Sequence, residues 1–229
     1  MTIHRHFDDQ LQELKGRLVT MGTAAETMIE QAVRSLLERD GARHAEVFKI
    51  EQQVNNLHIE VDERVINLIA LQHPVAADLR LMVMCSKIAG ELERIGDQAV
   101  NICQNTGELL RYPPLKPLID IPLMAEIARR MLRESLDAFV RQDALLAQKV
   151  LNTDDEVDAF KNQIFRELLT YMMSDPGTIP RALALILISR NLERVGDHAT
   201  NVAEEVIYAA QGRDVRHHHE ETKRTEEGK

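Results

Sequence analysis

The sequence predicts an all-α protein built from two tandem three-helix bundles, and three observations carry this prediction. Hydrophobic residues make up 44% of the 229 residues, while aromatic residues make up 3% and Trp is absent. Such a mixture favours helices over sheets. Apolar residues recur at steps of three and four along most of the chain, which is the helical period. Finally, the hexapeptide Leu92–Asp97 recurs 100 residues later as Leu192–Asp197, which indicates an internal repeat.

The first half begins with two expected long helices. An apolar stripe from Phe7 to Ala32 steps by four and three for almost four heptads and predicts a long first helix, which Gly41 closes. A short helix is expected over residues 42–49. A second long helix carries the apolar positions from Val54 to Leu68 and ends before Pro74.

The third helix and the proline-rich segment after it complete the first half. The stripe from Leu81 to Ile102 marks the helix, with Asp78 as its expected N-cap. The segment Tyr112–Pro117 holds three prolines, which remove backbone donors and break a helix. We therefore predict a first bundle over residues 1–112, a second over residues 118–212, and a disordered tail over residues 213–229.

The second half repeats this plan. Asp120 with Pro122 opens a helix, and Asp143 falls near its end. A long helix is expected from about Asp155 to Met173, and the seam from Leu185 to Val202 marks the last helix. Narrow apolar stripes on long helices suit antiparallel bundle packing at shallow crossing angles.

The third helix of each half carries a ladder of polar residues beside its apolar seam. Glu93, Asp97 and Asn101 stand four residues apart, on a face turned away from the core. Glu193, Asp197 and Asn201 repeat the ladder in the second half. Two carboxylates at this spacing repel each other on an isolated helix, so we expect positive charge between them. Hard cations take oxygen ligands of this kind.

The second helix offers further metal ligands on one flank. Asn55, His58 and Asp62 each follow an apolar seam position and share a helical face. If that face borders the ladder, the two helices form one constellation, in which His favours iron or zinc over magnesium or manganese. The second half matches less well. Asp158 is equivalent to Asn55, but Lys161 and Phe165 occupy the positions equivalent to His58 and Asp62. A weaker second site is therefore predicted.

A structural reading of the same residues competes with metal binding. Glu93 with Arg94, and Glu193 with Arg194, can simply form interhelical ion pairs, which stabilise a surface by about 0–1 kcal/mol. The repeated glycine at positions 96 and 196 has its own cost. A glycine inside a helix destabilises it by about 1 kcal/mol relative to Ala, so close helix packing is the expected compensation.

Composition and motifs exclude several other classes. The net charge of −9 and the lack of a basic cluster argue against nucleic-acid binding. No apolar stretch reaches the roughly 20 residues of a membrane span. The two cysteines, Cys85 and Cys103, lie in apolar helical patterns and are expected as reduced core thiols. No nucleophile elbow, phosphate loop or HExxH motif is present, and no Glu is followed three residues later by the His that a di-iron bundle oxidase needs.

The third helices are apolar over more than one face. Leu79 to Cys85 and Ala182 to Ile188 are almost uninterrupted apolar runs. Such runs predict burial on more than one side, either between the two bundles or against a second subunit.

The paired hexapeptide, the segment Gln53–Ala70 and the segment Thr170–Pro180 closely resemble the PhoU family, and the resemblance extends from Phe7 to about Gly212. It implies two three-helix bundles that form a homodimer in the cytoplasm. It further implies an adaptor between the ATPase subunit of the phosphate ABC transporter and the phosphate-sensing histidine kinase, which reaches the membrane only through these partners. Such a protein represses the phosphate-starvation (Pho) regulon and restrains phosphate uptake.

The same resemblance also bears on the ladders. Some family members hold iron or zinc on Glu/Asp-x-x-x-Asp motifs, which map onto Glu93 with Asp97 and onto Glu193 with Asp197. The motif of the second helix maps onto His58 and Asp62, with His in place of the usual acid. The alternative function is a metal-storage protein or a metal-dependent enzyme that uses these ladders.

Overall fold

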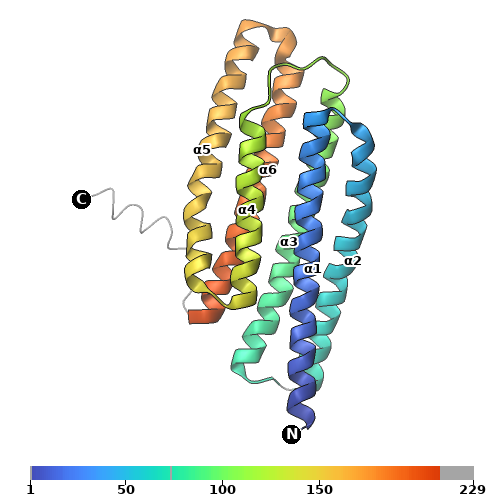
Figure 1. The fold of residues 1–229 in the computed structure, drawn as a ribbon, viewed down its shortest axis with the longest axis vertical. Helices are drawn as coiled ribbons and strands as arrows, with labels where there is room; N and C mark the ends of the chain where they lie inside the picture. Colours follow the sequence, from blue (N-terminus) through green and yellow to red (C-terminus); the bar gives the residue numbers. More distant parts are fainter. Residues whose placement is uncertain (1, 73, 212–229) are drawn as a thin grey trace, which may run out of the picture.

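The computed structural model describes residues 2–72 and 74–211, and these residues form six α-helices joined by short turns (Figure 1). The first half holds α1 (Thr2–Glu38), α2 (His44–Gln72) and α3 (Ala76–Leu109), and the second holds α4 (Asp120–Arg141), α5 (Ala144–Ser174) and α6 (Ile179–Gln211). Two 3₁₀ turns, Gly41–Arg43 and Pro176–Thr178, precede α2 and α6. The expected tail, residues 213–229, lies outside the described residues.

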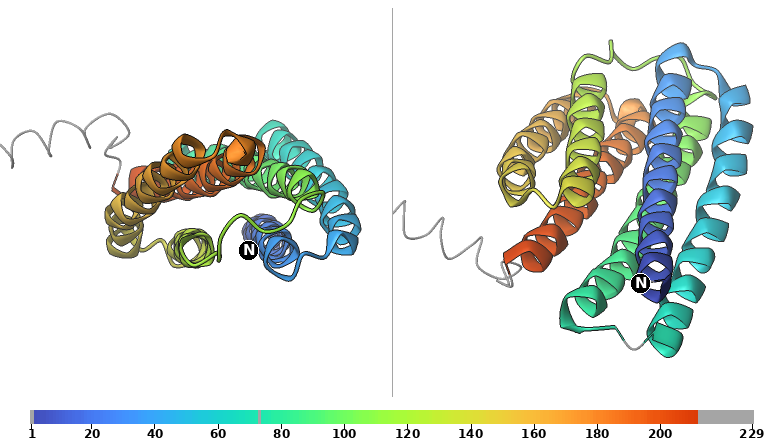
Figure 2. Two further views of the ribbon diagram at one scale, coloured as in Figure 1. Left: turned by 90° about the horizontal axis from the view of Figure 1, so that it is seen from above. Right: turned by 60° about the horizontal axis from the view of Figure 1, so that its bottom comes forward.

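The helices form two three-helix bundles, as predicted. Figure 2 shows α5, α6, α3 and α2 side by side in a curved layer, with α4 and α1 on its inner side. The two halves meet along α3 and α6, and also along α1 and α4. Because α3 and α6 run antiparallel, the α2–α3 hairpin and the α5–α6 hairpin lie at opposite ends of the molecule (Figure 1).

The core follows the apolar stripes read from the sequence. All eight predicted core positions of the first helix, from Phe7 to Ala32, are buried. In α6 the predicted seam residues Leu185, Ile188, Leu192 and Val195 are buried as well. Amphipathic periodicity is a strong signal in long helices, and it located most of the core positions predicted for α1, α2, α3 and α6, although Leu57 and Leu81 are only partly buried.

The repeated glycines lie where helices approach closely. A Cβ built on Gly96 would stand 3.4 Å from Met28 Cε and 3.7 Å from Val54 Cγ1. The same contacts recur in the second half, where Gly196 faces Met131 and Val157. These are ordinary van der Waals distances, so an alanine side chain would fit at either position, and the packing does not by itself explain the glycine in each hexapeptide.

Two helix starts in the first half differ from the prediction. The segment 42–49 is not a separate helix: Asp40 caps the turn Gly41–Arg43 by accepting a bond from the Ala42 amide, and α2 then runs unbroken from His44. The N-cap of α3 is Val75, which offers no side-chain acceptor, and Asp78 lies in the first turn instead. A carboxylate there still interacts favourably with the helix dipole.

The start of α5 also differs from the prediction. Asp143 falls near the end of the preceding helix, as predicted, but it also begins the next one. It is the N-cap of α5, because its carboxylate accepts hydrogen bonds from the amides of Leu145 and Leu146. The helix thus starts at Ala144, eleven residues before the predicted Asp155. The apolar positions Ala147, Val150 and Leu151 continue the stripe backwards.

Two further expectations concern the interior and the membrane. Cys85 and Cys103 are free and buried, as predicted, and burial raises the pKa of each thiol to about 12. Such thiols are not reactive nucleophiles at neutral pH. Within residues 2–72 and 74–211, no helix combines the length and apolar composition that a membrane crossing requires.

Candidate functional site

Four carboxylates from α5 and α6 gather in the second half, and one lysine pairs with two of them. Asp154 and Asp158 come from α5, while Glu193 and Asp197 come from α6. The Lys161 ammonium donates to Asp158 Oδ1 at 2.7 Å and to Glu193 Oε1 at 2.8 Å. Lys161 therefore supplies the positive charge that the sequence predicted near these carboxylates.

The carboxylates are close enough to perturb one another. Burial, together with the charges of Asp197 and Asp158, raises the pKa of Asp154 to about 6. Burial and the charges of Glu193 and Asp158 also raise the pKa of Asp197. Burial alone would lower the pKa of Lys161, but its two hydrogen bonds outweigh that effect and raise it. One lysine thus leaves part of the negative charge uncompensated.

In the first half, the predicted constellation is divided between two heights along the helices. His58 Nε2 lies 3.5 Å from Asp62 Oδ2, and Ser86 donates a hydrogen bond to Asp62. His58 also lies against Gly90, because a Cβ built there would be 4.0 Å from Nε2. Asp62 therefore lies at the height of Ser86, and His58 lies at the height of Gly90, one turn before Glu93 on α3.

Because α2 and α3 run antiparallel, residues that come earlier in α2 lie level with the ladder of Glu93 and Asp97. Val54 packs at the height of Gly96, so Glu93 lies between that height and the height of His58, beside Asn55. By the same register Glu51, one turn before Asn55, comes nearest to Asp97 in height. Of the three α2 residues predicted as ligands, Asn55 is the one that reaches the level of the ladder.

Sequence reasoning missed Asp154 and Glu51. The repeat itself carried the signal, because an offset of 103 residues aligns Val54 with Val157 and therefore Glu51 with Asp154. Each residue also stands four positions before a predicted ligand, Asn55 or Asp158.

The amide of Asn201 is engaged with the other half instead of the acid cluster. Asn201 Nδ2 donates to Glu91 Oε2 at 2.9 Å, and His198 Nδ1 lies 2.8 Å from the same oxygen. Burial would raise the pKa of Glu91, but these hydrogen bonds outweigh it and hold that pKa below its usual range. Asn101, its counterpart in the first half, accepts a bond from Asn105 through its backbone carbonyl.

Of the interhelical ion pairs that the structural reading expected from the hexapeptides, Glu193 forms one with Lys161 of α5, whereas neither hexapeptide arginine forms one among the described residues. Arg94 pairs within α3 with Glu91 at 3.3 Å, not with Glu93. Arg194 is exposed and has no ion pair with any residue in the described ranges. Other pairs join the halves, among them Lys87 with Glu205 at 2.9 Å and Arg129 with Glu30 at 2.9 Å. The carboxylates of the ladders are therefore not explained by the arginines beside them.

The arrangement suits a divalent cation only with some rearrangement. Among the residues that the structure describes, no three His, Cys, Asp or Glu side chains converge closely enough to hold a metal ion. The donors available in the second half are all carboxylate oxygens, which hard cations prefer. A cation entering there must displace Lys161 from Asp158 and Glu193.

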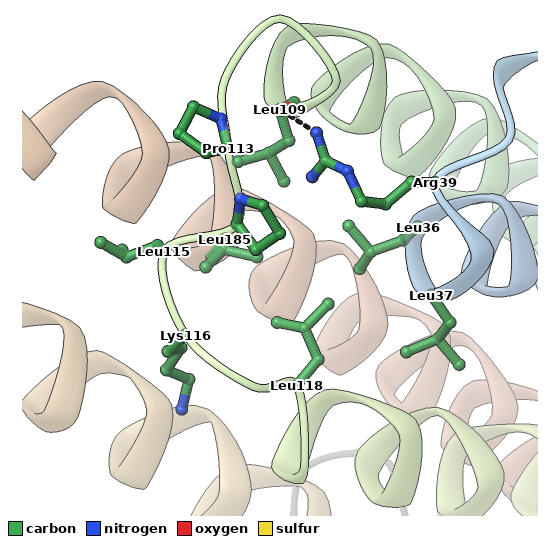
Figure 3. A pocket seen from close by; sticks show the side chains of 10 residues that line it. Leu36, Leu37, Arg39, Leu109, Pro113, Leu115, Lys116, Leu118 and Leu185 are labelled. Carbon is green, nitrogen blue, oxygen red and sulfur yellow. Dashed lines mark hydrogen bonds between the residues drawn. The ribbon is translucent and has the colours of Figure 1, made fainter.

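A separate apolar cavity of about 250 Å³ lies where the linker between α3 and α4 crosses the two halves (Figure 3). Its two cations are already engaged. The Arg39 guanidinium donates to the carbonyl of Tyr112 at 2.6 Å and to that of Leu109 at 3.3 Å, and Lys116 pairs with Glu167. Six leucines, Pro113 and Pro114 supply the remaining wall. These contacts hold the linker in place, and none of them points to a ligand.

Comparison with known protein families identifies the family of this chain. The model of the PhoU domain matches it twice, over residues 18–106 and 121–206, which are the two halves described above. The chain belongs to the PhoU family.

PhoU relatives match almost the whole length of the chain. The Pseudomonas putida protein named "Phosphate-specific transport system accessory protein PhoU homolog" is 38% identical over 94% of this chain and 84% of its own length. The Aquifex aeolicus protein of the same name is 39% identical over 92% of this chain and 95% of its own length. The Escherichia coli accessory protein PhoU is 34% identical over 94% of this chain and 89% of its own length.

Two solved PhoU structures share the architecture. PhoU from Pseudomonas aeruginosa superposes with a TM-score of 0.87 at 36% identity and covers 90% of this chain and all of its own. The PhoU phosphate transport regulatory protein from Streptococcus pneumoniae gives a TM-score of 0.84 at 23% identity, over 91% of this chain and 99% of its own, which supports the fold alone. The tandem three-helix bundle is thus the PhoU fold.

The raised pKa of Asp154 predicts how stability depends on pH. The folded state binds a proton at Asp154 more tightly than the unfolded state, whose value is 3.8, so stability falls as pH rises from about 4 to about 6. In chelator-treated protein, Asp154→Asn should therefore raise the free energy of unfolding at pH 7 by about 1 kcal/mol, discounted for partial exposure. Urea unfolding at pH 7 and pH 4 measures this. A variant less stable than wild type at pH 7 contradicts it.

Proposed function

We propose that this chain is a non-enzymatic accessory protein of bacterial phosphate uptake. The support comes from relatives matched over more than nine-tenths of the chain, which are named phosphate-specific transport system accessory proteins. The sequence is consistent with this, since it carries no motif of a nucleophile, a phosphate loop or an HExxH metal site. Regulation by binding, with no chemical step, accounts for a protein of this kind.

In this proposal the chain acts in the cytoplasm as a homodimer. It bridges the ATPase subunit of the phosphate ABC transporter and the phosphate-sensing histidine kinase. When phosphate is plentiful, the bridge holds the kinase in the state that represses the phosphate-starvation regulon and limits uptake. The long exposed faces of α5 and α6 support this reading, because an adaptor needs accessible surface for its partners.

A reporter strain tests the regulatory proposal. Deletion of the gene should raise a phosphate-starvation promoter many-fold in phosphate-replete medium, and expression of the chain should restore repression. Purified chain should also bind the purified ATPase subunit and the kinase in separate pull-down assays. Unchanged reporter activity after deletion, or no binding to either protein, overturns the adaptor proposal.

The acid cluster favours a second candidate function, the binding of a divalent cation. Asp154, Asp158, Glu193 and Asp197 bring four carboxylates together near one lysine, and two of the four have raised pKa values. A bound cation would neutralise this charge and fix α5 to α6. Iron and zinc are the metals that the sequence suggested, while the oxygen donors also suit manganese and magnesium.

Metal analysis of untagged protein purified without chelators tests this second function. Wild type should retain more iron, zinc or manganese than Glu193→Ala combined with Asp197→Ala. The matched control, Glu126→Ala combined with Asp137→Ala, removes two exposed carboxylates from α4 and should retain wild-type metal. Equal metal content in all three proteins refutes the site.

A further inference from the structure

The two halves of the chain pack against each other through equivalent helices. α3 contacts α6 and α1 contacts α4, so each contact joins a helix of the first half to its repeat in the second (Figure 2). Because equivalent helices meet, the half-to-half interface resembles the two-fold interface of a symmetric dimer. An interface of this kind can also form between like halves of two copies, unless particular side chains select the pairing.

The repeat establishes which residues of α1 and α4 are equivalent. A Cβ built on Gly96 would contact Met28 in the first half, and a Cβ built on Gly196 would contact Met131 in the second. Met28 and Met131 therefore occupy the same place in the two bundles. They are separated by 103 residues, and this offset aligns the rest of α1 with α4.

At this offset, two acids of α1 align with two bases of α4. Glu26 is equivalent to Arg129, and Glu30 is equivalent to Arg133. These side chains meet across the half-to-half interface. Arg129 Nη2 lies 3.2 Å from Glu26 Oε1 and 2.9 Å from Glu30 Oε2, and Arg133 donates a hydrogen bond to Glu26. Equivalent positions of the two halves thus carry opposite charges, and each charge contacts its opposite.

Pairing of like halves would bring like charges together at these contacts. If α1 met α1 of a second copy in the same geometry, glutamates would face glutamates. If α4 met α4, arginines would face arginines. The side chains of Arg129 and Glu26 are only 19% and 20% exposed, so solvent screens their charges incompletely. Like charges at such positions disfavour the contact, whereas the two halves of one chain match.

A charged contact between α3 and α6 makes the same distinction. Lys87 of α3 lies 2.9 Å from Glu205 of α6. At the offset of 100 residues, their equivalents are Leu187 and Asn105, which carry no charge. A pairing of α6 with another α6 would place Leu187 opposite the buried Glu205 and remove the ammonium of Lys87. Loss of a counter-charge from a desolvated carboxylate disfavours that arrangement.

We propose that these charges select the opposite half of the fold as the partner of each half and exclude the like half of a second copy. The selection acts during synthesis, when a completed first half exposes α1 and α3 before α4 and α6 exist. Two first halves then repel each other through Glu26 and Glu30, so each stays available for its own second half. A homodimer of the chain must therefore form through another surface. This inference does not rest on the adaptor proposal.

Two charge-reversed variants of the full-length chain test the selection. The basic variant carries Glu26→Arg and Glu30→Arg, so α1 and α4 are both positive at the interface. The acidic variant carries Arg129→Glu and Arg133→Glu, so both helices are negative there. Each variant alone should melt about 10 °C below wild type, because its halves repel. The chain with all four substitutions exchanges the signs and should melt within about 3 °C of wild type.

A mixture of the basic and acidic variants gives the decisive measurement. Each half of one variant finds a half of opposite charge only in the other variant. After refolding together from urea, or after co-expression, the mixture should melt about 8 °C above either variant treated alone. Native mass spectrometry should show complexes with equal numbers of the two chains, whose masses differ through their substitutions. This result would show that the charges choose the partner and do more than stabilise the interface.

The control for the basic variant makes the same charge change away from the interface. Glu46→Arg with Glu63→Arg alters two exposed positions of α2. This control should melt within about 4 °C of wild type, and mixing it with the acidic variant should stabilise neither. The inference is overturned if the basic and acidic variants melt like wild type, or if their mixture melts no higher than its components. Complexes of the two chains in random proportions, or a chain with four substitutions that does not regain stability, also overturn it.

Discussion

Leu192→Ala is expected to lower the free energy of unfolding by about 3 kcal/mol, because it opens a cavity where α6 meets its neighbours. Leu192 is fully buried near the middle of α6, the helix that contacts α3, α4 and α5. The loss combines the transfer free energy of the removed methyl groups with a cavity that rigid helices fill poorly. Urea unfolding monitored by circular dichroism measures the change.

Leu187→Ala is the matched control for this prediction. It makes the same substitution on the same helix, but Leu187 is 37% exposed and belongs to the outer surface. Its cost should stay below about 1 kcal/mol, because little apolar area returns to water and no closed cavity forms. Equal losses for the two variants would show that position 192 is not the packed centre described here.

Lys161→Met is expected to destabilise metal-free protein by about 1–2 kcal/mol at neutral pH, and to raise its affinity for divalent cations. The substitution keeps the apolar stem of the side chain but removes the ammonium from between Asp158 and Glu193. The four carboxylates then repel one another without a counter-charge, and an added cation replaces the lost ammonium. Thermal unfolding with and without millimolar Mn²⁺ measures both effects.

The control for Lys161→Met is Lys149→Met on the same helix. Lys149 pairs with one acid, Glu134, at 2.7 Å and is more exposed than Lys161. Its substitution should change stability by less than about 1 kcal/mol and should leave the response to Mn²⁺ unchanged. If Mn²⁺ stabilises wild type and both variants equally, the cluster around Lys161 is not the place where the cation acts.

Helix periodicity predicted the fold, because long amphipathic helices place the core on one stripe of each helix. The duplicated hexapeptide predicted the tandem arrangement, and the packing of Gly96 and Gly196 follows the duplication residue by residue. The start of α5 was less predictable. Asp143 suits the end of one helix and the N-cap of the next equally well, and only the direction of its hydrogen bonds distinguishes these positions.

The candidate site was only partly predictable, since it depends on the register between helices. The sequence gives the face of each ligand on its own helix, but the height at which two helices meet is set by the length of the turn between them. Residues Glu93, Asp97, Glu193 and Asp197 were found because they repeat. The ligands on α2 depend on the register between α2 and α3, and Asp154 was missed because the same register was needed to place it beside Asp197.

The antiparallel contact of α3 with α6 has a consequence for simultaneous association with two proteins. It sets the two hairpin ends apart along helices of up to 34 residues, or about 50 Å at 1.5 Å per residue. Two proteins held at these ends do not compete for space. When the two proteins are themselves held in one assembly, binding of the first raises the effective concentration of the second at the other end by an amount that depends on that fixed spacing. The helices thereby link binding at one hairpin end to binding at the other through their fixed separation, without a conformational change.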